Sequence, residues 1–559
     1  MWGRAFPLVP TTRNPFCTSL HYSALLLTLF LGVDFPLPVS IPLPVGDSRS
    51  RGIQIQIHRK FLVPAFSALL IAAAAKPLLS QSVPSVTVNW SKKTPNHTTA
   101  TMQAVVNPML RRGSPIHDAA FADLRQLDAD YARYAFWFPY PKLSVAELRP
   151  PDKNQTFWDF QYMDPLVEDF LAATDGHSAV WSFSTNPQWM YTTPKPIVYP
   201  DDPNQVFWDY TQGNQLHDVK ELADYYGRLA SWYMQGGFTD ELGKFHSSGH
   251  HYDLRYWEVF NEIDSEHEPT PEQYAERYDA IVEAVRKVAP QMKFVGLSLS
   301  YPAGGQTMFE YFLNPAHHKA GIPLDYISFH VYAAPGADQT LDNWQFTFSD
   351  RASEFLAETR YILQIRDRLS PSTKIMVNEA GSILSGDMVQ GEPGHVEAPI
   401  PPAYWNLSGT LYAYLYVELA KMGVDVVGES QLVGFPSQFP SVSMVDWTTG
   451  KPNARYTVLE LVKNNLGPGS EFADVDVKPN GKPADADAIN VTAFLAGKQR
   501  KFILINPRNR EISVELPQEC AGASAQTIGG ASPDVVKKQI PEAKFRMPPF
   551  SVTILTLKD

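Results

Sequence analysis

The chain has 559 residues, of which 44% are hydrophobic, and it carries a formal net charge of -12. This length is enough for one domain of barrel size together with a smaller domain, and the composition is that of a globular protein. The acidic balance lacks the excess of Lys and Arg that binding to a phosphate backbone needs, so no nucleic acid partner is expected. The two cysteines, Cys17 and Cys520, provide no disulfide framework.

The N-terminal region differs in character from the rest of the chain. It holds two apolar runs, residues 23–33 and 61–75, which are both too short to span a bilayer comfortably. The second run follows a short basic stretch and contains small residues, so residues 58–82 have the parts of a secretory signal. We therefore expect a secreted or periplasmic protein, with residues 1–57 a disordered leader or an overextended start. A membrane anchor in this region is the alternative, although no stable membrane insertion is expected after processing.

The central part of the chain, about residues 101–468, alternates short β-rich runs with long amphipathic stretches, as βα units around a parallel sheet do. Eight strands are expected: MQAVVNP (102–108), YARYAFWF (131–138), SAVWSFST (178–185), RYWEVF (255–260), KFVGLSLS (293–300), DYISFHVY (325–332), KIMVNEAG (374–381) and VDVVGES (424–430). This number favours a (β/α)8 TIM barrel over an open doubly wound sheet, which is the alternative. The absence of a Gly-rich phosphate loop after the first strand also favours the barrel.

Two of the intervening helices can be placed from the sequence. The first has Thr270 as its N-cap, Pro271 at its first position and Gln273 in a capping box, and Pro290 marks its end. Its buried face is predicted by the helical spacing of Tyr274, Tyr278, Ile281, Val285 and Val288. A second helix is expected over residues 350–369.

The C-terminal region, residues 469–559, alternates apolar and polar residues in period two and shows no helical pattern. The alternating segments are DAINVTAFLAGKQRKFILINPRN (487–509), REISVEL (510–516) and PPFSVTILTL (548–557). This pattern predicts a small antiparallel β-sandwich domain. Residues 83–100, which precede the barrel, contain the strand candidate SVTVNW (85–90), and this strand is a candidate member of the same β domain.

Two of the expected barrel strands end in the dipeptide Asn-Glu. Asn261-Glu262 follows the fourth strand and Asn378-Glu379 follows the seventh. In a (β/α)8 barrel the carboxyl ends of the strands form the active site, so both carboxylates would point into one mouth. Retaining glycoside hydrolysis needs such a pair, because one carboxyl protonates the leaving oxygen while the other attacks the anomeric carbon. Two solvated carboxylates at loop starts are the alternative.

The segments WEVFNEID (257–264) and NEAGS (378–382) resemble the catalytic segments of glycoside hydrolase family 39, which belongs to a large clan of retaining (β/α)8 glycosidases. The resemblance extends over roughly residues 100–555. It implies that Glu262 is the acid/base, that Glu379 is the nucleophile and that Asn261 bonds the sugar 2-hydroxyl.

The same resemblance extends to the other strands. SFHVY (328–332) is similar to the clan's His-x-Tyr segment, which implies that His330 and Tyr332 hold the nucleophile side of the sugar. Arg133, expected at the end of the second strand, matches a position that buttresses the nucleophile. Trp189 is a candidate for stacking on a sugar, with packing at the rim of the barrel as the alternative.

Strand eight departs from the clan pattern. Many relatives end this strand with a Trp that forms the floor of the sugar site, whereas GESQLVGF (428–435) offers Glu429, Ser430 and Gln431. Gln431 is therefore a candidate substrate-binding residue. Glu429 is either a third carboxylate of the site or the partner of a nearby Arg or Lys.

The segment HSSGHH (246–251) places three imidazoles close together, which raises the possibility of a metal site. It is Gly/Ser-rich and lacks the regular spacing of a metal motif, so we expect a solvated loop and no metal.

Three functions follow from these patterns, and the substrates given for the first are those that the resemblance to family 39 implies. The first is a retaining glycosidase that needs no cofactor and acts in exo mode on β-xylosides or related plant or microbial glycans, with α-L-iduronides or another sugar of the clan as alternatives. The second is a carbohydrate-binding barrel without turnover, and the third is a metal-dependent hydrolase that uses the histidine segment. The carboxylate pair favours the first, and the oligomeric state stays open.

Overall fold

The computed structural model describes residues 83–558 except 209–214, 390–398, 436–437 and 480–487. The expected leader and signal segment, residues 1–82, lie outside the described residues. Within the described part, no helix is both long enough and apolar enough to cross a membrane.

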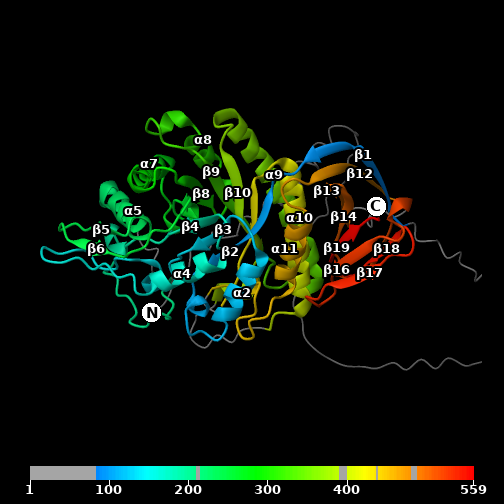
Figure 1. Ribbon diagram of the computed structural model, residues 1–559, viewed down its shortest axis with the longest axis horizontal. Helices are drawn as coiled ribbons and strands as arrows, with labels where there is room; N and C mark the ends of the chain where they lie inside the picture. Colours follow the sequence, from blue (N-terminus) through cyan, green and yellow to red (C-terminus); the bar gives the residue numbers. More distant parts are fainter. Residues whose placement is uncertain (1–82, 209–214, 390–398, 436–437, 480–487, 559) are drawn as a thin grey trace, which may run out of the picture. The chain divides into compact units, whose positions relative to one another are not determined.

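Eight parallel strands close into a barrel (Figure 1). They are β2 (Thr99–Val105), β3 (Ala132–Ala135), β4 (Ala179–Ser182), β7 (Tyr256–Glu258), β8 (Lys293–Leu299), β9 (Tyr326–Ala333), β10 (Lys374–Ser382) and β11 (Val426–Glu429). Because the last strand, β11, pairs with the first strand, β2, the sheet has no open edge. All eight expected strands are confirmed, and the open doubly wound sheet is excluded.

Each barrel strand is followed by at least one helix. The long helices are α2 (His117–Leu127), α4 (Met163–Ala173), α5 (Val219–Met234), α7 (Pro271–Val288), α8 (Gln306–Phe312), α9 (Leu341–Leu369), α10 (Pro402–Met422) and α11 (Ala454–Asn465). The capping box of α7 is confirmed, because Thr270 and Gln273 exchange both hydrogen bonds. The helix expected over 350–369 begins earlier, at Leu341. Its start is hard to recognise in the sequence, because its capping box uses Asn343 in place of the usual Glu or Gln.

A second sheet of nine strands forms the β domain. Its strands are β1 (Ser85–Pro95), β12 (Glu471–Lys478), β13 (Asn490–Ala496), β14 (Gln499–Asn506), β15 (Ile512–Glu515), β16 (Ser524–Ile528), β17 (Val536–Gln539), β18 (Lys544–Met547) and β19 (Ser551–Thr556). The candidate strand before the barrel, β1, pairs antiparallel with β12 and so belongs to this sheet. Ala525 in β16, the second strand of the order, and Phe545 in β18, the last, share one apolar core. The sheet therefore curls around that core.

Both faces of the central strand β14 are buried. Phe502 and Leu504 lie in the core of the β domain, whereas Ile503 and Ile505 belong to the apolar cluster that also contains the barrel helices. Successive side chains of a strand point to opposite faces, which is why residues 502–505 form a continuous apolar run where one buried face would give alternation with polar residues.

Candidate active site

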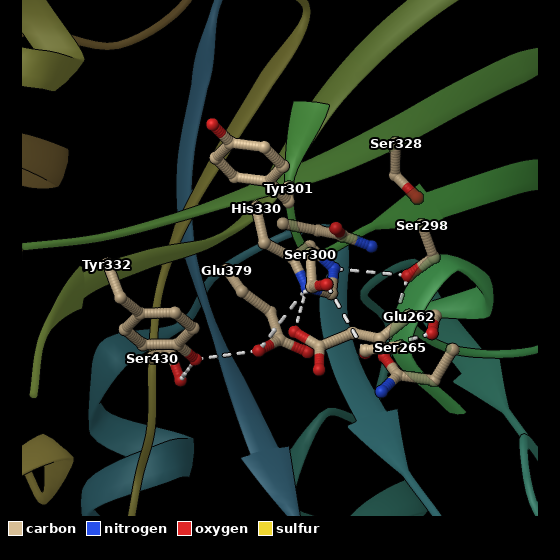
Figure 2. Close-up of polar contacts among 12 residues, drawn as sticks. Glu262, Ser265, Ser298, Ser300, Tyr301, Ser328, His330, Tyr332, Glu379 and Ser430 are labelled. Atoms are coloured by element: carbon tan, nitrogen blue, oxygen red, sulfur yellow. Dashed lines mark hydrogen bonds and ion pairs between the residues drawn. The ribbon is translucent and has the colours of Figure 1, made fainter. Parts of the chain in front are cut away.

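Two glutamates face each other at the carboxyl ends of the barrel strands (Figure 2). Glu379 lies in β10, and Glu262 follows β7 at the start of the short helix α6 (Ile263–Glu266). Their carboxylates offer oxygens within 4.8 Å of each other. Carboxyl groups are about 5–5.5 Å apart in retaining glycosidases and about 6.5–9.5 Å apart in inverting ones. An oxygen of one carboxylate within 4.8 Å of an oxygen of the other is compatible with the closer arrangement, which works by double displacement.

The backbone turns sharply to bring Glu262 into the mouth. Phe260 and Glu262 have φ values of 69° and 38°, in the left-handed region that residues with a side chain rarely adopt. Asp264 fastens the turn, because its carboxylate accepts hydrogen bonds from the backbone amides of Ser300 (2.9 Å) and Tyr301 (2.8 Å). Such conformations are held only where surrounding contacts fix them, and they cluster at functional sites.

Glu379 is surrounded by hydrogen-bond donors. Arg133 Nη1 donates to its Oε1 at 2.6 Å, and Tyr332 Oη donates to its Oε2 at 2.6 Å. His330 Nδ1 lies 3.6 Å from the same Oε2. Burial alone would raise the pKa of Glu379, but the charges of His330 and Arg133 and the bond from Tyr332 outweigh it and hold this pKa below its ordinary value. Glu379 is thus kept ionised, as a nucleophile must be.

Glu262 has the opposite electrostatic setting. Burial raises its pKa, and the negative charge of Glu379 adds to the effect, although the hydrogen bond and charge of His330 oppose it. His330 Nδ1 lies 2.9 Å from Glu262 Oε1, and its Nε2 lies 3.0 Å from Ser298 Oγ. Burial would lower the pKa of His330, but the two glutamates outweigh it and raise this pKa. In this pair, the raised pKa of Glu262 favours its protonated form, and the lowered pKa of Glu379 favours its ionised form.

Arg133 lies inside the barrel, at the second position of β3, and not at the end of the strand as expected from the sequence. Its long side chain accounts for the difference, because it spans from the barrel interior up to Glu379. Its Nε donates to Glu258 Oε2 at 2.6 Å. Glu258 is fully buried and also accepts from Ser328 Oγ (2.9 Å) and Asn378 Nδ2 (2.6 Å). One guanidinium therefore compensates two buried carboxylates.

Replacing Arg133 by Met is expected to lower the free energy of unfolding by about 3–5 kcal/mol, because it leaves two buried carboxylates without their cation. Urea unfolding followed by circular dichroism measures the change. Arg368→Met is the matched control, because Arg368 pairs with Glu310 on the surface, where such a pair contributes about 0–1 kcal/mol. Equal losses in the two variants would contradict the role given to Arg133.

The end of strand eight contributes a serine to the site. Ser430 Oγ accepts a hydrogen bond from Gln103 Nε2 at 2.6 Å and donates one to Tyr332 Oη, whose single hydrogen goes to Glu379. Glu429 pairs with Arg455 at 2.9 Å, and both side chains are fully buried, so it is the partner of an arginine. Gln431 is buried and donates to the carbonyl of Gln438 at 3.1 Å, so the structure does not bring this candidate to the glutamate pair.

Trp189 lies apart from the pair. Its indole nitrogen donates to the carbonyl of Glu147 at 2.9 Å, and the ring is half-buried. It lines a cavity of about 1080 Å³ together with other aromatic residues, among them Trp158 and Tyr199. Neither glutamate of the pair belongs to the lining of this cavity.

The histidine segment does not gather its imidazoles around one point. His246 Nε2 lies 2.8 Å from Asp240 Oδ2, and His250 Nε2 lies 3.3 Å from Asp164 Oδ2. Each of these rings thus has its own carboxylate. Within the part of the chain that the structure describes, the one group of three residues with metal-ligating side chains within reach of each other is Glu262, His330 and Glu379, which is the glutamate pair with its histidine.

Sequence reasoning missed Glu258 and Ser298, and at the end of strand eight it chose Gln431 as the candidate instead of Ser430. Glu258 carried a signal, because it is a charged residue inside an apolar strand and a buried charge needs a partner. Ser298 carried none, since it turns inward at a bulge in β8 where Leu297 and Ser298 have φ values of 76° and 51°.

No family model and no curated protein matches this sequence. Solved structures do match its fold. The family 51 arabinofuranosidase from Xanthomonas axonopodis pv. citri has a TM-score of 0.57 at 13% identity, over 85% of this chain and 100% of that one. An α-L-arabinofuranosidase from Thermotoga maritima has a TM-score of 0.56 at 13% identity (85% and 99% covered), and a glucosidase from Croceicoccus marinus has 0.53 at 13% (85% and 99%). These similarities show the fold, a (β/α)8 barrel with a β domain.

Proposed function

We propose that this protein is a retaining glycoside hydrolase. The observation that carries the proposal is the pair Glu262 and Glu379, whose oxygens lie within 4.8 Å and whose pKa values are shifted in opposite directions. Two carboxyls with opposed environments are the arrangement that divides acid and nucleophile roles between chemically identical groups. No cofactor takes part in the proposed reaction.

In the first step, Glu379 attacks the anomeric carbon while Glu262 donates its proton to the leaving oxygen. The bond between the anomeric carbon and the leaving group breaks, and an ester between the sugar and Glu379 forms. Arg133 and Tyr332, which both donate to Glu379, direct the attacking carboxylate and keep it ionised before the attack.

In the second step, Glu262, now ionised, removes a proton from water, and the resulting hydroxide displaces Glu379 from the anomeric carbon. Two inversions return the original configuration. His330 bonds Glu262 on one side and Ser298 on the other, so the ring holds the acid/base through both steps.

The pH dependence of kcat/KM should be bell-shaped and lie on the mildly acidic side. Activity needs Glu379 ionised, so it is lost as the pH falls through the lowered pKa of Glu379. Activity also needs Glu262 protonated, so it is lost as the pH rises through the raised pKa of Glu262. The two limbs report the pair as a whole. A profile that stays flat between about pH 4 and 8 would count against the assignment.

We infer an exo-acting enzyme on β-xylosides or related glycans, as the resemblance to family 39 implies. α-L-Arabinofuranosides are a second candidate, because two of the structures with the same fold are named arabinofuranosidases. We also propose that the protein is secreted, on the signal-like sequence of residues 58–82.

The test is release of nitrophenol from a panel of aryl glycosides: β-xyloside, β-glucoside, β-galactoside, α-L-arabinofuranoside and α-L-iduronide. The proposal predicts turnover of at least one of them and no effect of a chelator. Binding of glycans without turnover of any aryl glycoside or oligosaccharide would replace the glycosidase with a carbohydrate-binding barrel. Loss of turnover with a chelator would favour the metal-dependent hydrolase.

A further inference from the structure

Glu266 is a buried carboxyl that the proposed mechanism does not use. It is the last residue of α6, one helical turn after Glu262, and its backbone amide donates to the carbonyl of Glu262 at 2.8 Å. Only 6% of the residue is exposed. A carboxyl this close to the glutamate pair adds a repulsive charge when it is ionised, so its presence calls for an explanation.

The contacts of Glu266 connect it to Asn261. Its Oε1 accepts two hydrogen bonds, one from Asn261 Nδ2 at 2.8 Å and one from Trp137 Nε1 at 2.6 Å. Trp137 holds this oxygen from the side of the loop after β3, where its ring packs against Phe439 with centroids 6.0 Å apart. The acceptor position of Glu266 is thus fixed by a second donor that does not belong to the glutamate pair.

Both the oxygen and the nitrogen of the Asn261 side-chain amide are hydrogen-bonded. Its Oδ1 accepts from Arg133 Nη2 at 2.6 Å, while its Nδ2 donates to Glu266. A guanidinium has donors and no acceptor, and Trp137 already occupies Glu266 Oε1 as a donor. The amide can therefore adopt only one of its two orientations, with its nitrogen on the Glu266 side.

The charge of Glu266 fits the same role. Burial and then the neighbouring charge of Glu262 raise the pKa of Glu266 well above its ordinary value. The neutral carboxyl still accepts hydrogen bonds at Oε1 through its carbonyl oxygen. It adds no negative charge beside Glu262, whose own protonation the reaction needs.

We propose that Glu266 is a positioning residue that fixes the amide of Asn261, so that its second N–H faces the sugar bound between Glu262 and Glu379. This inference rests on the proposed function and on the expectation that Asn261 bonds the sugar 2-hydroxyl. Glu266 itself does not touch the sugar. Replacing Glu266 should therefore lower kcat/KM only for substrates that carry the hydroxyl which Asn261 recognises.

The test compares wild type, Glu266→Gln and Glu266→Leu on an aryl glycoside of the accepted sugar and on its 2-deoxy analogue. Glutamine keeps an oxygen acceptor and should stay within about threefold of wild type on both substrates. Leucine removes the acceptor and should lower kcat/KM about 10- to 100-fold on the parent glycoside, but less than about threefold on the 2-deoxy analogue. Asn261→Ala should give the same pattern, and combining it with Glu266→Leu should add no further loss.

Equal losses on the two substrates, or no loss with Glu266→Leu, would overturn the positioning role. If Glu266→Leu does not fold, Trp137→Phe decides, because it removes one of the two donors to Glu266 and should produce a weaker loss that is again confined to the parent glycoside. If wild type hydrolyses no glycoside, the proposed function fails, and crystal structures of wild type and Glu266→Leu decide the inference. An Asn261 side chain that keeps its position in Glu266→Leu contradicts it, and a side chain that moves away from that position supports it.

Discussion

Replacing Glu379 by Gln is expected to lower kcat by at least about 10⁴-fold on any glycoside that wild type hydrolyses, because a carboxamide is too weak a nucleophile to attack the anomeric carbon. The change is nearly isosteric, because the amide oxygen can accept from Arg133 and the amide nitrogen can donate to Tyr332 Oη, whose hydroxyl can then donate to Ser430 Oγ. The loss should therefore appear in kcat with the melting temperature nearly unchanged. Initial rates of nitrophenol release and a thermal melt measure the two quantities.

Glu147→Gln is the matched control for this change. Glu147 is another fully buried carboxyl, in the loop region between β3 and α4, and burial raises its pKa to about 8, so glutamine replaces a group that is already neutral near pH 7. This variant should keep kcat within about threefold of wild type. A comparable loss in both variants would mean that any buried carboxyl matters, and it would remove the special role of Glu379.

Replacing Glu262 by Gln is expected to produce a loss that depends on the leaving group. General acid catalysis contributes about 10²–10⁴-fold, and a poor leaving group such as a second sugar needs all of it. A dinitrophenyl group leaves without a proton, so its first step should be almost unaffected. Rates on an oligosaccharide and on a dinitrophenyl glycoside of the same sugar measure the difference.

The same variant has a second signature. Azide needs no general base to attack the glycosyl-enzyme, so adding it should restore turnover of the dinitrophenyl glycoside in Glu262→Gln and not in Glu379→Gln. Equal losses on good and poor leaving groups, without rescue by azide, would show that Glu262 is not the acid/base.

Much of the site could be predicted from the sequence, because the carboxyl ends of all strands of a (β/α)8 barrel lie close together in space. Glu262 and Glu379 are 117 positions apart in the chain, yet the rule that carboxyl ends of parallel strands meet at one mouth brings them together. The positions of His330 and Tyr332 followed from the same rule and the resemblance of SFHVY. Tyr332 donates to Glu379, on the side that the resemblance implies, whereas His330 contacts Glu262 more closely than Glu379 (2.9 against 3.6 Å).

Other features depend on side-chain reach and local backbone conformation, which no sequence period encodes. Arg133 acts from within β3 because its side chain extends to Glu379, and Ser298 turns inward only through a bulge. Gln431 lies next to Ser430 in the chain, but Ser430 contacts Tyr332 and Gln431 turns to Gln438. The side chains of neighbouring residues after the end of a strand point in different directions, so the sequence alone does not predict which of the two reaches the site.

In the proposed mechanism, Glu379 forms a covalent bond with the sugar. The experiment uses a 2-deoxy-2-fluoro dinitrophenyl glycoside of the accepted sugar. The fluorine slows both the formation and the hydrolysis of the glycosyl-enzyme, and the good leaving group speeds its formation, so that the intermediate accumulates. Peptide mass spectrometry should then find one fluorosugar on the peptide that contains Glu379, and fragmentation should place it on that residue. A label on another residue, or no label although the parent glycoside is hydrolysed, would contradict the account.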